Sequence, residues 1–282
     1  MDYLSGTLPD SALWRTFLPI ETLKYAGFGK LAYRHMYRDT ESGTVFLTDG
    51  SNPDMGVHVQ MGGNALEFFR ANHNFTDAQI AALFLKHARK VSRCDLAIDL
   101  HGGELRPSHM QQMQQDGRMK TRSRTFEYRD KTENGKRGET FYIGSRQSRK
   151  YFRGYDKNAE QDIVSDVNWL RLELECKDML AGAIADKVSK YGSAPVAAMA
   201  ISNVVMFDHP EYIEAITTEL TGMPTIPRKP TKTEKWLLKT VSRTLANCVM
   251  ANPSFMGDFV KRVQEELTRA NEGDNSTNLT DG

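Results

Sequence analysis

The stretch Trp169–Lys177 constrains the fold most, because it alternates apolar and charged residues without a break. The apolar positions are Leu170, Leu172, Leu174 and Cys176, and the charged positions are Arg171, Glu173, Glu175 and Lys177. Successive side chains of a strand point to opposite faces. We therefore expect a strand with one face buried against a core and one face wholly charged, which is typical of an antiparallel sheet.

Other segments extend this sheet. Residues 92–100 form an apolar run that carries two aspartates, and residues 150–157 are expected to form a further strand with Tyr151, Arg153 and Tyr155 at alternate positions. Residues 125–128 and 140–143 flank the pair Asn134-Gly135, which is a strong hairpin signal. We expect an α+β fold with antiparallel sheets built from ferredoxin-like β-α-β units.

The chain becomes helical after Asp178 and changes character again at a proline-rich stretch. Helices are expected at 181–191, 196–206 and 212–220 from their apolar spacing. The expected organisation is one domain at 1–222, a linker at 223–230, a helical C-terminal segment at 231–270 and a disordered polar tail at 271–282.

Composition excludes several classes of protein. The longest apolar run, at about 194–207, is too short and too often interrupted for a membrane span, so we expect no membrane contact. The first residues show no secretory signal. Three scattered cysteines give neither a zinc motif nor a disulfide framework, and we expect free thiols in a cytoplasmic protein.

Basic residues gather in one part of the chain although the whole chain has a net charge of only +1. Between Arg118 and Lys157 there are thirteen basic and five acidic residues, a local net charge of +8. Seven phenylalanines and tyrosines stand among them. This pattern fits a groove that follows a nucleic-acid backbone and stacks bases on rings, and it equally fits a solvated basic hairpin.

Four expected strands carry polar side chains at alternate positions, so a shared sheet would bring them to one face. They are His58 on the first, Asp95 and Asp99 on the second, Glu173 and Glu175 on the third, and Tyr151, Arg153 and Tyr155 on the fourth. Hard divalent cations prefer oxygen ligands, and a metal with an arginine can neutralise a phosphodiester while a tyrosine attacks it. Each feature alone also fits ordinary packing or a solvated face, so these residues by themselves indicate only phosphate handling.

Three segments in order carry a more specific pattern. Residues 142–157 contain Tyr-Ile-Gly-Ser-Arg-Gln-Ser and then Arg-Gly-Tyr-Asp-Lys, residues 93–99 read Arg-Cys-Asp-Leu-Ala-Ile-Asp, and residues 171–173 read Arg-Leu-Glu. Together with the strand and glycine turn at 58–63, they resemble the Rep-trans replication initiation factors. These are rolling-circle initiators of plasmids and filamentous phages, with related relaxases of integrative elements. The resemblance runs from about residue 25 to 220, and the region after Thr221 adds nothing to it.

The resemblance implies roles for individual residues. Tyr155 is the expected nucleophile, with Tyr142 and Tyr151 as competing phenols, and Arg153 and Lys157 lie on the same strand face as Tyr155. The expected ligands of a Mg²⁺ or Mn²⁺ ion are Asp95 and Glu173, followed by Asp99, His58 and Glu175. The expected DNA contacts are Arg146, Ser145, Arg149, Lys150 and Arg124.

The activity implied by the resemblance is metal-dependent nicking and rejoining of one DNA strand at an origin, by domain 1–222. A 5′-phosphotyrosine forms and a 3′-hydroxyl is left as a primer. The implied partners are single-stranded or hairpin origin DNA, the host helicase and polymerase, and a second copy of the chain. A relaxase of an integrative or conjugative element, and a non-catalytic origin-binding regulator with the same fold, remain as alternatives.

Overall fold

The computed structural model describes residues 1–9, 20–133, 136–220, 242–252 and 254–276. The chain divides into two compact units, Met1–Pro224 and Thr225–Gly282. The expected linker at 223–230 and the hairpin residues Asn134 and Gly135 lie outside the described residues. The first unit contains every residue considered below as part of a site.

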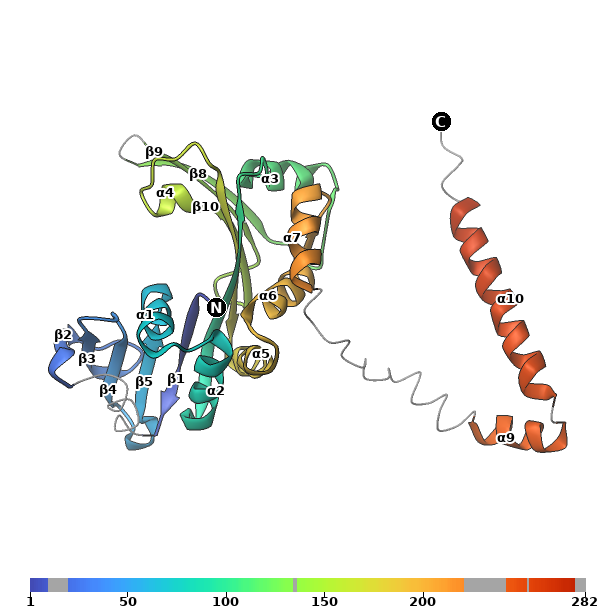
Figure 1. Ribbon diagram of the computed structural model, residues 1–282, viewed down its shortest axis with the longest axis horizontal. Helices are drawn as coiled ribbons and strands as arrows, with labels where there is room; N and C mark the ends of the chain where they lie inside the picture. The colour runs from blue at the N-terminus through green and yellow to red at the C-terminus, as the bar shows by residue number, and fades with distance from the viewer. Residues whose placement is uncertain (10–19, 134–135, 221–241, 253, 277–282) are drawn as a thin grey trace. The chain divides into compact units, whose positions relative to one another are not determined.

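The first unit is built on one ten-stranded sheet (Figure 1). Its strands in spatial order are β2 (Leu23–Phe28), β3 (Tyr33–Asp39), β4 (Val45–Gly50), β5 (Val57–Met61), β1 (Tyr3–Leu8), β6 (Lys90–His101), β11 (Trp169–Lys177), β10 (Lys150–Asp156), β9 (Lys136–Ile143) and β8 (Phe126–Glu133). All neighbouring strands are antiparallel. A small second sheet pairs β7 (Met119–Thr121) with β12 (Val205–Phe207). The predicted α+β class with antiparallel sheets is confirmed.

Helices connect and cover the strands. In the first unit they are α1 (Gly63–His73), α2 (Asp77–His87), α3 (Pro107–Gln115), α4 (Lys157–Glu160), α5 (Asp178–Tyr191), α6 (Ser193–Ser202) and α7 (Pro210–Leu220), with short 3-10 turns at Ile20–Thr22 and Pro53–Met55. The second unit contains α9 (Ser242–Ala251) and α10 (Phe255–Ser276). The N-terminus of α2 shows why such helices begin where they do, because Thr76 and Gln79 form a reciprocal capping box.

The core lies between the sheet and helices α5 and α6, which pack on β6 and β11 (Figure 1). The even-numbered residues of β11 face this core, and Leu172 and Leu174 lie opposite Ile98 and Leu96 of β6. Because side chains alternate, the odd-numbered residues of β11 lie on the other face of the sheet. The alternation in the sequence therefore decides which side chains can form a polar site.

One predicted helix is shorter than the sequence indicates. The apolar run predicts a helix over 196–206, but α6 ends at Ser202 and residues 205–207 form strand β12. Thr121 explains part of the difference, because its hydroxyl donates to the Val204 carbonyl at 2.7 Å and Val205 pairs with it in the small sheet. The pairing of residues 205–207 with β7, more than eighty residues earlier in the chain, therefore outweighs the helical spacing of the local sequence.

The described part of the second unit is helical, as expected. Helix α10 continues to Ser276, beyond residue 270 where the sequence predicts the helical segment to end. Among the described residues, none of the helices is long and apolar enough to cross a membrane.

Candidate active site

The open face of the sheet brings the predicted polar residues into three rows. In an antiparallel pair, residues directly opposite each other share a face. One row contains Asp95, Glu175 and Tyr151, the next Ala97, Glu173, Arg153 and Tyr142, and the third Asp99, Arg171, Tyr155 and Thr140. Four neighbouring strands of the sheet therefore place phenols, carboxylates and guanidinium groups on one surface.

Tyr155 lies half-buried at the centre of this surface. Its phenol donates a hydrogen bond to Oε2 of Glu173 at 3.1 Å, and the other oxygen of Glu173 accepts from the Arg153 guanidinium. The guanidinium carbon of Arg153 lies 5.8 Å from the ring centre of Tyr155. Burial, and next the negative charge of Glu173, raise the pKa of Tyr155 above its ordinary value. The phenol is therefore protonated at neutral pH and has an acceptor for its proton within reach.

A short helix places a second cation beside the phenol. The Asp156 side chain caps α4 by accepting from the Ala159 amide at 3.1 Å. Lys157, the first residue of α4, is buried and donates to Glu160 at 2.6 Å. Its ammonium lies 5.7 Å from the ring centre of Tyr155. Two cations therefore flank the same ring.

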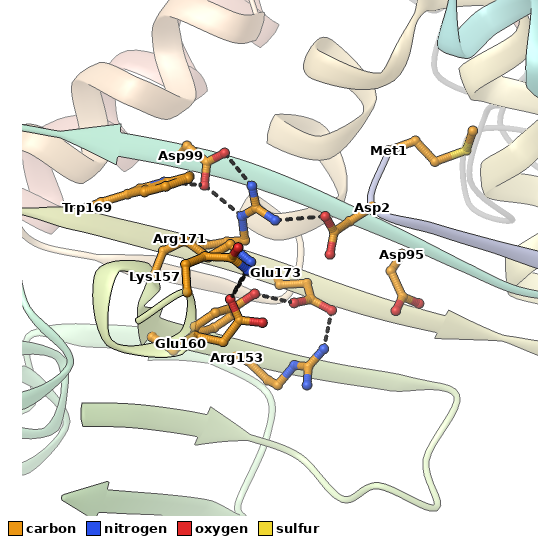
Figure 2. A network of polar contacts seen from close by, with 12 residues as sticks. Met1, Asp2, Asp95, Asp99, Arg153, Lys157, Glu160, Trp169, Arg171 and Glu173 are labelled. Carbon is orange, nitrogen blue, oxygen red and sulfur yellow. Dashed lines mark hydrogen bonds and ion pairs between the residues drawn. The ribbon is translucent and has the colours of Figure 1, made fainter. Parts of the chain in front are cut away.

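Arg171 lies directly opposite Tyr155 in the strand register. Two aspartates hold its guanidinium (Figure 2). Its Nε and Nη2 donate to the two oxygens of Asp99, each at 2.7 Å, and its Nη1 donates to Asp2 at 2.7 Å. The Trp169 indole donates to the same Asp99 at 3.0 Å. Asp99 thus orients an arginine and an indole, and bidentate pairing of this kind holds a guanidinium in one geometry.

A second cluster lies at the Asp95 end of the face. Nε of Arg93 donates to both oxygens of Asp95 at 3.0 Å, and its Nη2 lies 2.8 Å from Glu175. Lys177 contacts the other oxygen of Glu175 at 2.6 Å. Burial raises the pKa of Asp95 to about 7 against the opposing effect of Arg93, and Glu173 and Glu175 add to the rise. Buried carboxylates are thus concentrated here.

The Tyr155 surface forms one wall of a cleft of about 930 Å³. The sheet contributes Tyr155, Arg153 and Glu173, and α4 contributes Lys157. Residues of α1, including Arg70, line the cleft as well. The cleft is open and polar, which suits a charged polymer better than a small apolar ligand.

His58 is the predicted site residue that the fold places apart. It lies on β5 opposite Thr7 of β1, whereas Asp95 lies opposite Tyr3 at the other end of β1. Four residues along a strand span about 13 Å. The imidazole lies 3.5 Å from the Thr7 hydroxyl, and burial lowers its pKa to about 4. His58 is therefore a buried neutral residue away from the carboxylates.

The predicted ligands fit a hard cation in chemical type. Among the described residues, no group of three or more His, Cys, Asp or Glu side chains is placed so that it could hold a metal ion. Asp95, Glu173 and Glu175 nevertheless offer buried oxygens on neighbouring strands, which is the donor type that Mg²⁺ and Mn²⁺ prefer. Each is paired with arginine or lysine, so an ion would have to take the place of such a partner.

The predicted DNA contacts lie at the opposite end of β10 from Tyr155. Ser145, Arg146 and Arg149 are exposed in the turn between β9 and β10, and Lys150 begins β10. Arg124 is exposed just before β8. Five residues of a strand span about 17 Å, so this turn does not reach the phenol itself.

Two tyrosine rings lie between the cleft and the turn that joins β9 to β10. Tyr142 and Tyr151 stack with their ring centres 5.6 Å apart, and Arg146 lies 5.7 Å from the Tyr151 ring. Among the described residues, Glu173 accepts a hydrogen bond from Tyr155 and from neither of the other two tyrosines: Tyr151 is buried opposite Glu175, and Tyr142 lies opposite Arg153. The geometry favours Tyr155 over the two competing phenols.

Some residues of this site were not expected from the sequence. Arg93 and Arg171 belong to the segments that carry the resemblance, and Trp169 begins the alternating strand, but the sequence predicts no role for any of the three. Their signal was their position, because each lies an even number of residues from an expected acid on the same strand. Such spacing places Arg93 and Arg171 where they can neutralise the acidic face of their strands. No pattern in the sequence points to Asp2.

Comparisons with known proteins identify the family and the fold. The sequence model of a family described as replication initiation factor matches residues 89–263, more than half of the chain. A solved structure of a rolling circle replication initiator protein from Geobacillus stearothermophilus is similar in fold, with a TM-score of 0.68 over 77% of this chain and 94% of that chain. Its sequence identity is 18%, so it informs the fold alone. A search of curated protein sequences gave no significant match.

Proposed function

Because the chain belongs to the replication initiation factor family, we propose that it starts rolling-circle replication by nicking one DNA strand at an origin, with Tyr155 as the nucleophile. The observation that carries this proposal is the hydrogen bond from the Tyr155 phenol to buried Glu173, in a polar cleft flanked by cations. A phenol needs a base to attack phosphorus near neutral pH, and the raised pKa of Tyr155 makes that need greater.

The proposed reaction is a transesterification. The Tyr155 oxygen forms a bond to phosphorus while Oε2 of Glu173 takes the phenolic proton. The bond from phosphorus to the 3′-oxygen breaks, and the 3′-oxygen leaves with the electron pair and takes a proton from water in the cleft. The products are a 5′-phosphotyrosine and a free 3′-hydroxyl. Since one phosphodiester replaces another, a later 3′-hydroxyl can reverse the step and rejoin the strand.

Cations around the phenol fit the charge that develops on phosphorus. Arg153 and Lys157 lie within 6 Å of the Tyr155 ring centre, and Arg171 lies directly opposite Tyr155 on β11. Fixed donors aimed at a developing charge are worth more in a partly buried site than in water. We assign Asp99 to positioning Arg171, because both of its oxygens are engaged by that guanidinium.

Asp95, Glu173 and Glu175 are the residues that we propose would hold a Mg²⁺ or Mn²⁺ ion. When bound, such an ion supplies Lewis acidity to a phosphate oxygen. We leave His58 out of the proposed set because it lies on β5 opposite Thr7, away from these carboxylates.

We propose that the single DNA strand leaves the cleft along the Tyr142 and Tyr151 rings and reaches the turn that contains Ser145, Arg146 and Arg149. Arg124 and Lys150 add positive charge there. Backbone contacts of this kind position DNA, and base contacts select the origin. The host polymerase would extend the 3′-hydroxyl in the cytoplasm, a host helicase would open the duplex, and a second copy of the chain could take part.

Substitution of single tyrosines tests the proposal. Tyr155→Phe should abolish both nicking of supercoiled origin DNA and the covalent protein–DNA adduct, while origin binding stays near wild type. Tyr142→Phe, which also removes one cleft hydroxyl, is the matched control and should keep forming the adduct. Nicking that survives in Tyr155→Phe and disappears in Tyr142→Phe would move the nucleophile to Tyr142. A wild-type protein that binds but never nicks would be an origin-binding regulator.

Removal of divalent cations tests the proposed ion. Excess chelator should stop nicking and leave DNA binding unchanged, and added Mg²⁺ or Mn²⁺ should restore nicking. Full nicking in excess chelator would remove the ion from the reaction but leave Tyr155 in place.

A further inference from the structure

The hairpin of β2 and β3 forms one edge of the ten-stranded sheet and exposes large apolar side chains. Phe28 at the end of β2 is 91% exposed, and Tyr25 is 56% exposed. Leu31 in the turn is also exposed. Exposed rings on one hairpin are unusual for a surface without a partner.

The rings of this hairpin lie together on one face. Tyr25 lies opposite Tyr37 and Phe28 opposite His35 in the strand register. The Tyr25 ring centre is 5.6 Å from that of Tyr37 and 6.0 Å from that of His35. The hairpin thus offers a row of rings, of which Tyr37 is anchored on the core and the others are open.

Positive charge lies on the same hairpin, on the face opposite to the rings, because Lys24, Arg34 and Arg38 alternate with them along the strands. Residues 23–38 contain Lys24, Lys30, Arg34 and Arg38 and no aspartate or glutamate. All four basic residues are exposed, with Lys24 on the edge strand and Lys30 in the turn. The neighbouring Asp49 lies 3.5 Å from Arg34 and 3.7 Å from His35 and offsets one charge. A surplus of positive charge remains along the hairpin.

This surface is separate from the Tyr155 cleft. The strand order puts seven strand spacings between β2 and β10, or about 30 Å along the sheet. Tyr37 also faces the helix-covered side of the sheet, because it pairs through Phe46 and Val59 with Gly6, next to buried Leu4 and Leu8. The hairpin lies outside residues 89–263, which are the residues that the family model matches.

We propose that the β2–β3 hairpin is a second binding surface for single-stranded DNA. Unpaired bases stack on Tyr25, Phe28 and His35 on one face, and the backbone passes over the edge strand and the turn so that phosphates contact Lys24 and Lys30. Rings take bases without sequence preference, and bases stacked inside a duplex are not available to them. A protein partner of ordinary composition would leave the surplus of positive charge unmatched, so charge complementarity favours the polyanion. The proposal does not depend on Tyr155 being a nucleophile.

Photo-crosslinking of the full chain tests where a single strand lies. The probe is an oligothymidylate that carries 5-iododeoxyuridine, and the adducts are mapped by mass spectrometry. The expected result is adducts on Tyr25, Phe28 or His35 in addition to adducts near Tyr142. Adducts confined to residues 118–177 would overturn the proposal.

Two kinds of variant measure the contribution of the hairpin to oligothymidylate affinity by fluorescence anisotropy. Tyr25→Ala with Phe28→Ala should weaken binding by about tenfold or more, since one stacked base contributes about fivefold to over a hundredfold. Met179→Ala, which removes an equally exposed apolar side chain from α5, should leave it unchanged. Unchanged affinity in the double variant would overturn the proposal.

Lys24→Gln with Lys30→Gln keeps the rings and removes charge. It should reduce the dependence of log affinity on log salt by about 1.4, since each phosphate contact on a single strand contributes about 0.7. If wild type sediments as a dimer that these variants dissociate, with DNA affinity unchanged, the hairpin is a contact between copies and the proposal is wrong. Nicking of a short origin oligonucleotide should persist in the variants, so failure of the proposed nicking would be recognised separately.

Discussion

Glu173 accepts from both Arg153 and Tyr155, although only Arg153 lies directly opposite it in the sheet. Tyr155 reaches the same carboxylate along the diagonal, a distance that long side chains cover across neighbouring strands. Glu173 is only 2% exposed. Hydrogen bonds are electrostatically stronger in the low dielectric of a buried site than in water, so its two contacts are strong. The register of β10 on β11 therefore decides which tyrosine meets a base.

Asp95 should make stability depend on pH. Its folded-state pKa is raised to about 7 from an ordinary value near 3.8, so the native state binds more protons than the unfolded state between these values. The free energy of unfolding should fall as pH rises through this window, by at most about 4 kcal/mol. Asp95→Asn removes the titration, so the stability of the variant relative to wild type should increase with pH.

Urea unfolding of both proteins at pH 5 and pH 8 measures this difference. Asp99→Asn is the matched control: the pKa of Asp99 is lowered, chiefly by Arg171 and Trp169 acting against burial. Asp99 is therefore ionised in both states throughout this range, and its difference from wild type should stay constant. A constant difference for Asp95→Asn as well would show that Asp95 does not titrate there.

The sequence predicts the acids, the phenols, Arg153 and Lys157 as site residues, but it predicts no role for Arg93, Arg171 or Asp2. Glu173 and Tyr155 were expected from their strands, and strand alternation was enough to assign both to one face. The role of Arg171 in the site depends on the strand register, because the register places this arginine between Asp99 and Tyr155. Register depends on all strand contacts together, so a single strand pattern could not supply it.

At the scale of elements, β1 joins the two halves of the sheet. It pairs with β5 on one side and β6 on the other, and a bulge interrupts its pairing with β6 between Ser5 and Gly6. Nothing in the sequence indicates that the first strand lies in the middle of the sheet, because its partners are about fifty or more residues away. The β7–β12 pair was missed for the same reason.

Gly6→Ala should destabilise the sheet at this junction. A Cβ at position 6 would lie 2.4 Å from the Lys90 carbonyl oxygen and 2.5 Å from the Phe84 ring, closer than any real contact. Backbone must move to admit it, and we expect a loss of about 1–3 kcal/mol in the free energy of unfolding. Denaturant unfolding followed by circular dichroism gives the value.

Gly182→Ala is the matched control, because it makes the same chemical change in the interior of α5. A Cβ there meets nothing within 4 Å. The substitution should stabilise the protein by about 0.5–1 kcal/mol, since alanine loses less conformational entropy in a helix than glycine. If Gly6→Ala unfolds with a free energy no lower than that of wild type, β1 is not packed against β6 as described.

At the scale of the whole molecule, the first unit contains a complete core. Among the described residues, the buried hydrophobic side chains run from Leu4 to Ile216, and the division between units falls after Pro224. The expected boundary of the nicking domain at residue 222 stays a prediction about folding and activity. Composition alone could suggest it, because the proline-rich stretch separates two kinds of sequence.

A chain that ends at Pro224 should fold and keep the proposed chemistry. Its thermal midpoint should lie within a few degrees of the full chain, because its core is intact. It should nick a single-stranded oligonucleotide at the full-length rate, even if choice of the origin is lost. Differential scanning calorimetry and the adduct assay test the two parts. An unfolded product would show that residues after 224 complete the core.

The central claim is that one phenol, that of Tyr155, becomes covalently joined to the 5′ end of a nicked DNA strand. The most direct measurement is mass spectrometry of the wild-type adduct after nuclease and protease digestion. We predict a nucleotide mass on the peptide containing Tyr155, with fragment ions that locate it on that residue. A nucleotide located on Tyr142, on Tyr151 or on any other residue would contradict the account.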